Sequence, residues 1–193
     1  MPRIAALLLA AGRSERMGRC KQLLPLAGKP LVRHGLETLL AAGVEDIIVV
    51  LGARGGEIVR AIDDLPVTMV ENSDPASDMA GSVRVGLAAV AGDTQAVLVC
   101  LGDHPLVKAA TVQALTDSHA AYPDKIIIPL CNGRKGHPTL FPRAAIAEIH
   151  TVPTLRDIVN RDGERVMLLP LADPGVTADI DTPEDYRRIG GEG

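Results

Sequence analysis

The sequence is poor in aromatic residues: its 193 residues include one Phe, two Tyr and no Trp. Because sequence-tolerant binding of single-stranded nucleic acid relies on bases that stack on aromatic side chains, this composition disfavours that function. The net charge of −4 also disfavours a protein that binds duplex nucleic acid, since such proteins are typically basic. We therefore expect no nucleic-acid partner.

Cysteines and long hydrophobic runs are also scarce. The three cysteines, Cys20, Cys100 and Cys131, are too few and too scattered for a disulfide framework or a zinc site. No stretch approaches the roughly 18 uncharged apolar residues of a membrane span, so we expect no membrane partner. The first strand-like run begins at Ile4, which leaves no room for a signal peptide before it. These absences predict a protein of the reducing cytoplasm.

Apolar strand-like runs alternate with helix-like segments along the chain. Because the runs are continuously apolar, they predict a mostly parallel sheet that is covered on both faces, a three-layer αβα sandwich of the α/β class. We expect strands at Ile4–Leu9, Ile47–Leu51, Val67–Glu71, Ala96–Leu101, Lys125–Pro129, Thr139–Phe141, 165–170 and 177–180. We expect helices at Pro30–Ala42, Arg54–Asp63, Gly81–Ala91, Lys108–Ala121, near 142–148 and 153–161, and from Pro183. Ligands of such sheets bind beyond the carboxyl ends of the strands, here in the loops after the first, third and fourth strands.

The loop after the first strand is glycine-bearing and basic. Residues 1–60 hold nine Lys or Arg against five Asp or Glu, whereas the remainder holds eleven against nineteen. Four of these cations fall between Arg13 and Lys21. Small residues let backbone N–H groups approach a phosphate, and the cations supply the balancing charge. The loop is neither a Walker A motif nor a dinucleotide fingerprint, because it lacks their spacings. An ordinary solvated basic loop is the alternative.

The segment from Leu9 to Leu31, LAAGRSERMGRCKQLLPLAGKPL, matches a known pattern at every fixed position. That pattern is L-A-A-G-x-S-x-R-M-G-x-x-K-x-L-L-P-x-x-G-x-P-L. Asn72 with a later Gly-Ser pair, LGDHP, GHP and DIDTPED follow in order. The chain thus resembles the nucleotidyltransferases of molybdenum cofactor synthesis, and the cytidylyltransferases among them most closely. The resemblance implies a Rossmann-like, mostly parallel sheet of the nucleotide-diphospho-sugar transferase type.

The resemblance also implies roles for residues of the first loop. Arg16, Lys21 and the later Asp103 would be catalytic, with the two cations neutralising the phosphates. The implied nucleotide-binding set is Leu9, Ala10, Ala11, Gly12, Arg16, Lys21, Asn72, Ser82 and Asp103. Arg13, Arg19 and Cys20 stand at variable positions of the pattern, so no role is carried over to them.

Two acidic positions are expected to hold a cation. Asp103 ends the fourth strand, where a carboxylate suits Mg²⁺, but an aspartate here can equally cap the helix near Lys108. Period two places Asp179 and Asp181 on one face of a strand end, and the same acidic cluster also suits a helix start at Pro183. The resemblance assigns Asp103 and Asp181 to the metal, and leaves the role of Asp179 open.

Two further segments carry weaker signals. Gly81 and Ser82, opening a helix, would offer backbone contacts to the nucleotide, and Asp78 stands where many relatives of the family carry Gly. The GHP segment of the family lies toward the acceptor, so His137 is expected on the acceptor side. A purely structural histidine is the alternative.

We therefore expect a single nucleotidyltransferase domain over 1–193, with a nucleotide-binding part at 1–105 and an acceptor-binding part at 106–193. The implied reaction is Mg²⁺-dependent transfer of CMP from CTP to the terminal phosphate of molybdopterin cofactor, with release of pyrophosphate. CTP and the cofactor are the expected partners, together with a molybdoenzyme client. The alternatives are a guanylyltransferase, a sugar- or alcohol-phosphate nucleotidyltransferase, and a delivery protein without catalysis.

Overall fold

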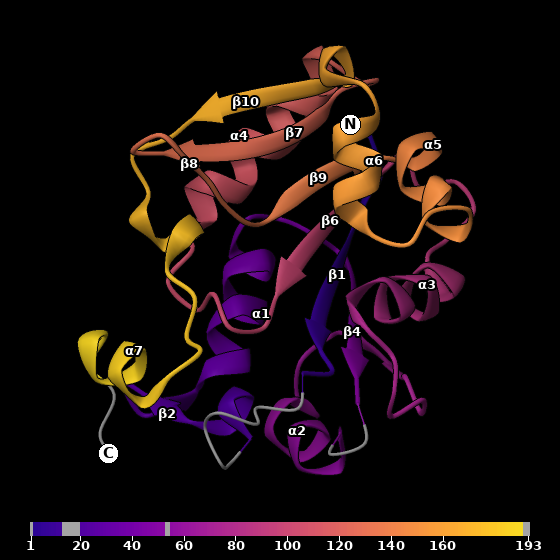
Figure 1. The fold of residues 1–193 in the computed structure, drawn as a ribbon. Helices are drawn as coiled ribbons and strands as arrows, with labels where there is room; N and C mark the ends of the chain where they lie inside the picture. The colour runs from indigo at the N-terminus through magenta and orange to yellow at the C-terminus, as the bar shows by residue number, and fades with distance from the viewer. Residues whose placement is uncertain (1, 13–19, 53–54, 191–193) are drawn as a thin grey trace.

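The computed structural model describes residues 2–12, 20–52 and 55–190 (Figure 1). Its larger sheet contains β1 (Ile4–Ala10), β4 (Asp46–Leu51), β5 (Thr68–Glu71), β6 (Ala96–Leu101), β7 (Ile126–Cys131), β8 (Arg134–Lys135), β9 (Thr139–Pro142) and β10 (Val166–Pro170). The helices are α1 (Leu31–Ala41), α2 (Gly55–Ile62), α3 (Met79–Ala89), α4 (Ala109–Ala121), α5 (Arg143–Ile146), α6 (Leu155–Arg161) and α7 (Pro183–Arg188). Short 3₁₀ helices cover Lys21–Leu23, Ala147–His150, Gly163–Arg165 and Pro174–Thr177.

The sheet runs in the order β10-β7-β9-β6-β1-β4-β5, with β8 paired to β7. Strand β1 pairs in parallel with both β6 and β4, and β5 continues in parallel beside β4. Strand β9 runs antiparallel to β6 and β7, so the sheet is mixed but mostly parallel. The carboxyl ends of β6, β1, β4 and β5 therefore meet at one edge, and the loops after them lie together.

Side chains of alternate residues in β1 point to opposite faces of the sheet. Leu8 packs in a cluster with buried residues of α1, α2 and α4, whereas Leu7 packs in another cluster with α3, α5 and α6. The helices thus form one layer on each face (Figure 1). This arrangement confirms the three-layer, mostly parallel α/β fold that the sequence predicts.

The carboxyl-terminal part follows the prediction less closely. Residues 177–180 are not a strand: Pro174–Thr177 form a 3₁₀ helix, and Ile180 donates one isolated hydrogen bond to the Asp103 carbonyl, at 3.0 Å. The turn forms because the Asp173 carboxylate accepts from the Gly175 N–H at 3.0 Å and because Pro174 suits the first helical position. The predicted strand at this place was wrong.

A hairpin that the sequence did not predict packs against helix α7. Strands β2 (Pro25–Leu26) and β3 (Lys29–Pro30) are joined by Ala27 and Gly28, both at positive φ, as a two-residue hairpin turn requires. Tyr186 of α7 is buried against this hairpin, and its hydroxyl donates to the Pro25 carbonyl. Helix α7 is therefore packed against the β2–β3 hairpin, and Figure 1 shows it beside β2.

Candidate functional site

Lys21 occupies the centre of the site. It begins the 3₁₀ helix Lys21–Leu23, and its side chain is 11% exposed. The ammonium nitrogen lies 2.7 Å from Asp103 Oδ2, 2.9 Å from Asp181 Oδ1 and 3.1 Å from the Ile180 carbonyl oxygen. Three oxygens, supplied by the β6 end and by the segment before α7, thus converge on one cation.

Asp103 lies just beyond β6, as predicted. Its Oδ2 accepts from Lys21, and its Oδ1 lies 2.8 Å from Nδ1 of His104. Burial favours a higher pKa for Asp103, but the hydrogen bonds from His104 and Lys21 and the charge of Lys21 hold that pKa well below its usual range. Burial likewise opposes the charge of Lys21, yet Asp103 and Asp181 together raise the pKa of the lysine. Both groups are therefore charged at neutral pH.

The alternative role of Asp103, capping the following helix, is not what the structure contains. Helix α4 begins after Lys108, whose N–H donates to the carboxylate of Asp173 at 3.0 Å. The Thr111 hydroxyl donates to the same carboxylate at 2.6 Å. A distant aspartate thus caps α4, and the carboxylate of Asp103 faces the site.

Asp181 likewise does not cap the helix that follows it, α7. Thr182 and Asp185 form a reciprocal capping box at the start of α7, so this helix start does not use the Asp181 carboxylate. The neighbouring Ile180 is fully buried beside the β2–β3 hairpin, which turns Asp181 toward Lys21. Asp179 is exposed.

The converging oxygens are suited to a hard divalent cation. Among the described residues, no group of three or more His, Cys, Asp and Glu side chains can hold a metal alone. Magnesium is commonly held by one or two carboxylates together with waters and substrate phosphates, so the two aspartates that converge here fit such a site. The ammonium of Lys21 lies between the same carboxylates and provides the opposite charge there.

Two glycines, Gly52 and Gly102, lie close to the end of β1. A Cβ on Gly52 would lie 2.8 Å from the Ala11 carbonyl oxygen, and one on Gly102 would lie 3.0 Å from the Leu9 carbonyl oxygen. Both glycines therefore let the neighbouring loops approach β1 closely. Leu9 is half-buried, Ala10 is buried and Gly12 is exposed, so the predicted phosphate-contacting backbone lies at the sheet edge. Arg16, Arg13 and Arg19 lie outside the described residues.

Gln22 is a residue that the sequence analysis missed. It is 2% exposed and accepts from the Cys20 thiol at 3.3 Å, and a Cβ on Gly12 would lie 3.5 Å from its amide nitrogen. Its side chain is therefore buried near Gly12 and Cys20, next to Lys21 in the chain. Residue 22 is a variable position of the family pattern, so the pattern did not indicate that Gln22 would be buried here.

Asn72 and Ser82 come together behind the loop after β5. The Asn72 amide donates to the Ser82 hydroxyl at 3.0 Å and to the Ser77 hydroxyl at 2.8 Å, and both Asn72 and Ser82 are buried. Helix α3 begins at Met79, two residues before the predicted start, because Asp78 caps it by accepting from the Gly81 N–H at 2.8 Å. The part of Asn72 and Ser82 in nucleotide binding stays a prediction.

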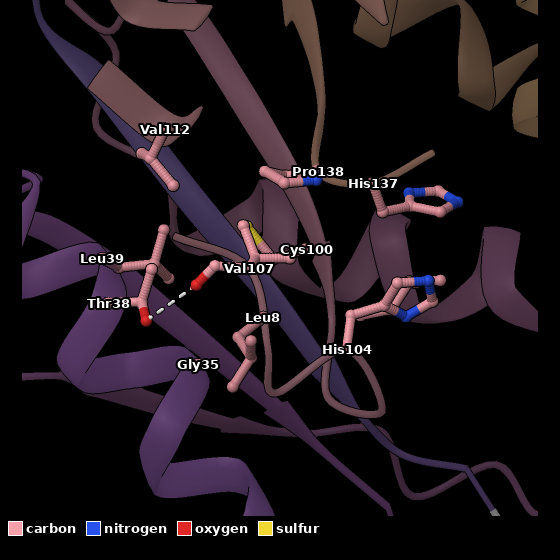
Figure 2. A pocket seen from close by; sticks show the side chains of 11 residues that line it. Leu8, Gly35, Thr38, Leu39, Cys100, His104, Val107, Val112, His137 and Pro138 are labelled. Atoms are coloured by element: carbon pink, nitrogen blue, oxygen red, sulfur yellow. Dashed lines mark hydrogen bonds between the residues drawn. The ribbon is translucent and has the colours of Figure 1, made fainter. Parts of the chain in front are cut away.

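His137 lies beside His104, and both line a small, mostly apolar cavity between α1, α4 and β6 (Figure 2). The two rings are edge-to-face, with centroids 5.5 Å apart and planes at 71°. Burial, and the neighbouring His104, lower the pKa of His137 to about 4. His137 is thus neutral at pH 7 and close to the carboxylate site, whereas Arg134 and Lys135 of β8 are exposed.

Solved structures with this architecture place the chain among the nucleotidyltransferases. A nucleotidyl transferase from Methanothermobacter thermautotrophicus matches with a TM-score of 0.82 and 26% identity over 96% of this chain and 95% of the other. Rv0371C of Mycobacterium tuberculosis, solved as a complex with manganese, matches with a TM-score of 0.82 and 29% identity over 97% of both chains. More narrowly, the sequence model of the MobA-like NTP transferase domain matches residues 6–168, and the chain belongs to that family.

Two relatives match nearly end to end. Nicotine blue oxidoreductase of Paenarthrobacter nicotinovorans is 31% identical over 98% of this chain and 97% of its own length. Molybdenum cofactor cytidylyltransferase of Escherichia coli is 28% identical over 96% of this chain and 95% of its own length. The chain spans only about a quarter of the length of the bifunctional GlmU proteins that it also matches. No helix among the described residues is long and apolar enough to cross a membrane.

Proposed function

We propose that this protein transfers CMP from CTP to the terminal phosphate of molybdopterin cofactor and releases pyrophosphate, with Mg²⁺ as the cofactor. The observation that carries the proposal is the convergence of Lys21, Asp103 and Asp181 at the carboxyl edge of the sheet. The similarity to the E. coli molybdenum cofactor cytidylyltransferase supports the choice of substrates.

In this proposal Asp103 and Asp181 hold the metal, with the Ile180 carbonyl close by. The metal, when bound, supplies positive charge to the phosphate oxygens of the nucleotide. Lys21, with Arg16, binds the triphosphate, and the backbone from Leu9 to Gly12 orients it. Catalysis then rests on positioning and charge neutralisation, which are the main requirements of phosphoryl and nucleotidyl transfer.

The acceptor needs no general base. A phosphate monoester has its second pKa at about 6, so its oxygen is already ionised near neutrality. That oxygen forms a bond to the α-phosphorus of CTP, and the bond from the α-phosphorus to the bridging oxygen breaks as pyrophosphate leaves. The neutral His137 and the exposed cations Arg134 and Lys135 suit the acceptor side of the site.

The first test is calorimetric binding of CTP, GTP, ATP and UTP in the presence of Mg²⁺, followed by pyrophosphate release with the cofactor. We expect a preference for CTP that is lost in Lys21→Ala, and at least a hundredfold slower release in Asp103→Ala. A preference for GTP would move the protein to the guanylyltransferase alternative. The protein would instead be a carrier if two results were found together. The wild type would release no pyrophosphate, and Asp103→Ala would still deliver the cofactor to a molybdoenzyme.

A second function is favoured by the relative named nicotine blue oxidoreductase. The matched assay follows the colour of the dye nicotine blue with an added redox co-substrate, under the same conditions as the transferase assay. Turnover of the dye without any nucleotide-dependent pyrophosphate release would replace the transferase proposal. Pyrophosphate release without dye turnover would support it.

A further inference from the structure

His104 makes one contact that distinguishes the two oxygens of Asp103. Its side chain is 9% exposed, and its Nδ1 lies 2.8 Å from Asp103 Oδ1. The other oxygen, Oδ2, lies 2.7 Å from the Lys21 ammonium. Because an ionised carboxylate only accepts hydrogen bonds, Nδ1 carries the proton in this contact. One oxygen of Asp103 is thus bound on the side of the histidine, and the other faces the cation.

We infer that His104 is a positioning residue for the metal site. Its Nδ1–H fixes the rotation of the Asp103 carboxylate, so that Oδ2 alone points into the metal site. This inference rests on the metal-dependent transfer proposed above. A carboxylate that is hydrogen-bonded at one oxygen cannot rotate freely about its Cβ–Cγ bond. It therefore cannot bind a metal through both oxygens at once. Mg²⁺ demands near-octahedral geometry, so a fixed single oxygen suits it.

His137 holds the ring of His104 in place. The edge-to-face contact of the two rings spans 5.5 Å between centroids, and Figure 2 shows the two imidazoles next to each other among the residues that line the cavity. The backbone N–H of His137 donates to the Val176 carbonyl at 2.8 Å. A Cβ on Gly136 would lie 2.3 Å from the same carbonyl oxygen, so the two segments are in close backbone contact. The ring of His104 is thus contacted by a separate part of the chain, which is itself hydrogen-bonded to Val176.

Partners of metal-binding side chains typically change metal affinity by about 10- to 100-fold when they are removed. A hydrogen-bonding role and a packing role of His104 can be separated by two substitutions. His104→Asn keeps an N–H near the position of Nδ1 and loses the ring, whereas His104→Phe keeps a ring against His137 and loses the donor. Exposed His150, replaced by Asn, is the matched control.

The experiment measures Mn²⁺ binding in the presence of CTP. The bound fraction is obtained from the loss of the electron paramagnetic resonance signal of free Mn²⁺. CTP binding without metal and the melting temperature are recorded for the same samples. We expect His104→Phe to weaken Mn²⁺ binding by about 10- to 100-fold, and His104→Asn and His150→Asn to stay within about threefold of the wild type. CTP binding without metal should change less than about twofold in all three, since no nucleotide contact is attributed to His104.

Retained Mn²⁺ affinity in His104→Phe, or a loss in His104→Asn equal to that in His104→Phe, would overturn the inference. If His104→Phe does not fold, His104→Ala takes its place as the variant without a donor: a loss of about tenfold or more supports the inference, and affinity near the wild type overturns it. If the wild type itself binds no Mn²⁺ with CTP, the proposed function fails and this inference fails with it. Normal Mn²⁺ binding by the wild type with unaffected variants overturns only the inference.

Discussion

The ammonium of Lys21 lies 2.7 Å from Asp103 Oδ2, although 82 residues separate the two in the chain. Asp181, a further 78 residues on, reaches the same nitrogen at 2.9 Å. The basic loop, the end of β6 and the segment before α7 are therefore joined at one ion-paired centre. The ammonium of Lys21 thus lies at the expected metal site.

Replacing that cation tests whether lysine and metal share the two carboxylates. In Lys21→Met, Asp103 and Asp181 face each other without an ammonium, and we expect a loss of about 3 kcal/mol in the free energy of unfolding. Mn²⁺ without nucleotide should then raise the melting temperature of the variant more than that of the wild type, because the metal replaces the missing charge. Thermal unfolding over a range of Mn²⁺ concentrations measures this.

Lys29→Met is the matched control for the lysine experiment. Lys29 pairs with Glu37 at 2.7 Å, but its side chain is 51% exposed, so its loss should change stability by less than about 0.5 kcal/mol. Equal stabilisation of wild type, Lys21→Met and Lys29→Met by Mn²⁺ would contradict a shared position of lysine and metal.

The depressed pKa of His137 predicts how stability depends on pH. Its pKa is lowered from 6.5 to about 4 in the fold, chiefly by burial, so the unfolded chain binds a proton more readily. The stability associated with neutral His137 is complete above pH 6.5 and is lost as the pH falls toward 4. The full loss is about 3 kcal/mol. Urea unfolding of the wild type at pH 7 and pH 4 measures it.

His137→Phe removes the titrating group and isolates its share of this pH dependence. We expect the stability of the variant to fall less between pH 7 and pH 4 than that of the wild type. His150→Phe, at an exposed position, should keep the wild-type slope. Parallel profiles for the wild type and His137→Phe would mean that other groups cause the acid sensitivity.

Much of the site was predictable because its residues follow strands. The pattern from Leu9 to Leu31 and the position of Asp103 after an apolar run place both at the carboxyl edge of a parallel sheet. The residue pattern alone left two roles open for Asp181, since one acidic cluster can cap a helix or hold a cation, and only the family resemblance assigned it to the metal. The structure separates the two, because Asp185 caps α7 and Asp181 pairs with Lys21.

Contacts between distant segments could not be predicted from local patterns. The spacing of Ile180 and its neighbours resembles a strand, but Asp173 and Pro174 form a turn there, and this depends on the donors of α4. The meeting of His104 and His137 likewise follows from the antiparallel placement of β9 beside β6. Neither feature has a periodic signal in the sequence.

Asp173 is the clearest case of a buried group that connects two segments. It is 2% exposed and accepts from the Lys108 N–H, the Thr111 hydroxyl and the Gly175 N–H. Asp173→Asn places an amide against these donors, so at least one hydrogen bond is lost inside the protein. We expect a loss of about 2 kcal/mol in the free energy of unfolding, measured in urea. Asp179→Asn, at an exposed position of the same segment, should cost less than about 0.5 kcal/mol, and an equal cost for both would contradict this role.

Gly175 tests whether the backbone contact behind the site also positions Asp181. A Cβ at this residue would lie 2.2 Å from the Leu106 carbonyl oxygen, and neither backbone can move aside cheaply. We expect Gly175→Ala to cost about 3 kcal/mol in the free energy of unfolding and to weaken Mn²⁺ binding with CTP, because it moves the segment that carries Asp181. Gly163→Ala meets nothing within 4 Å and should be neutral or slightly stabilising. A destabilised Gly175→Ala that binds Mn²⁺ like the wild type would show that Asp181 is positioned by the β2–β3 hairpin and α7 alone.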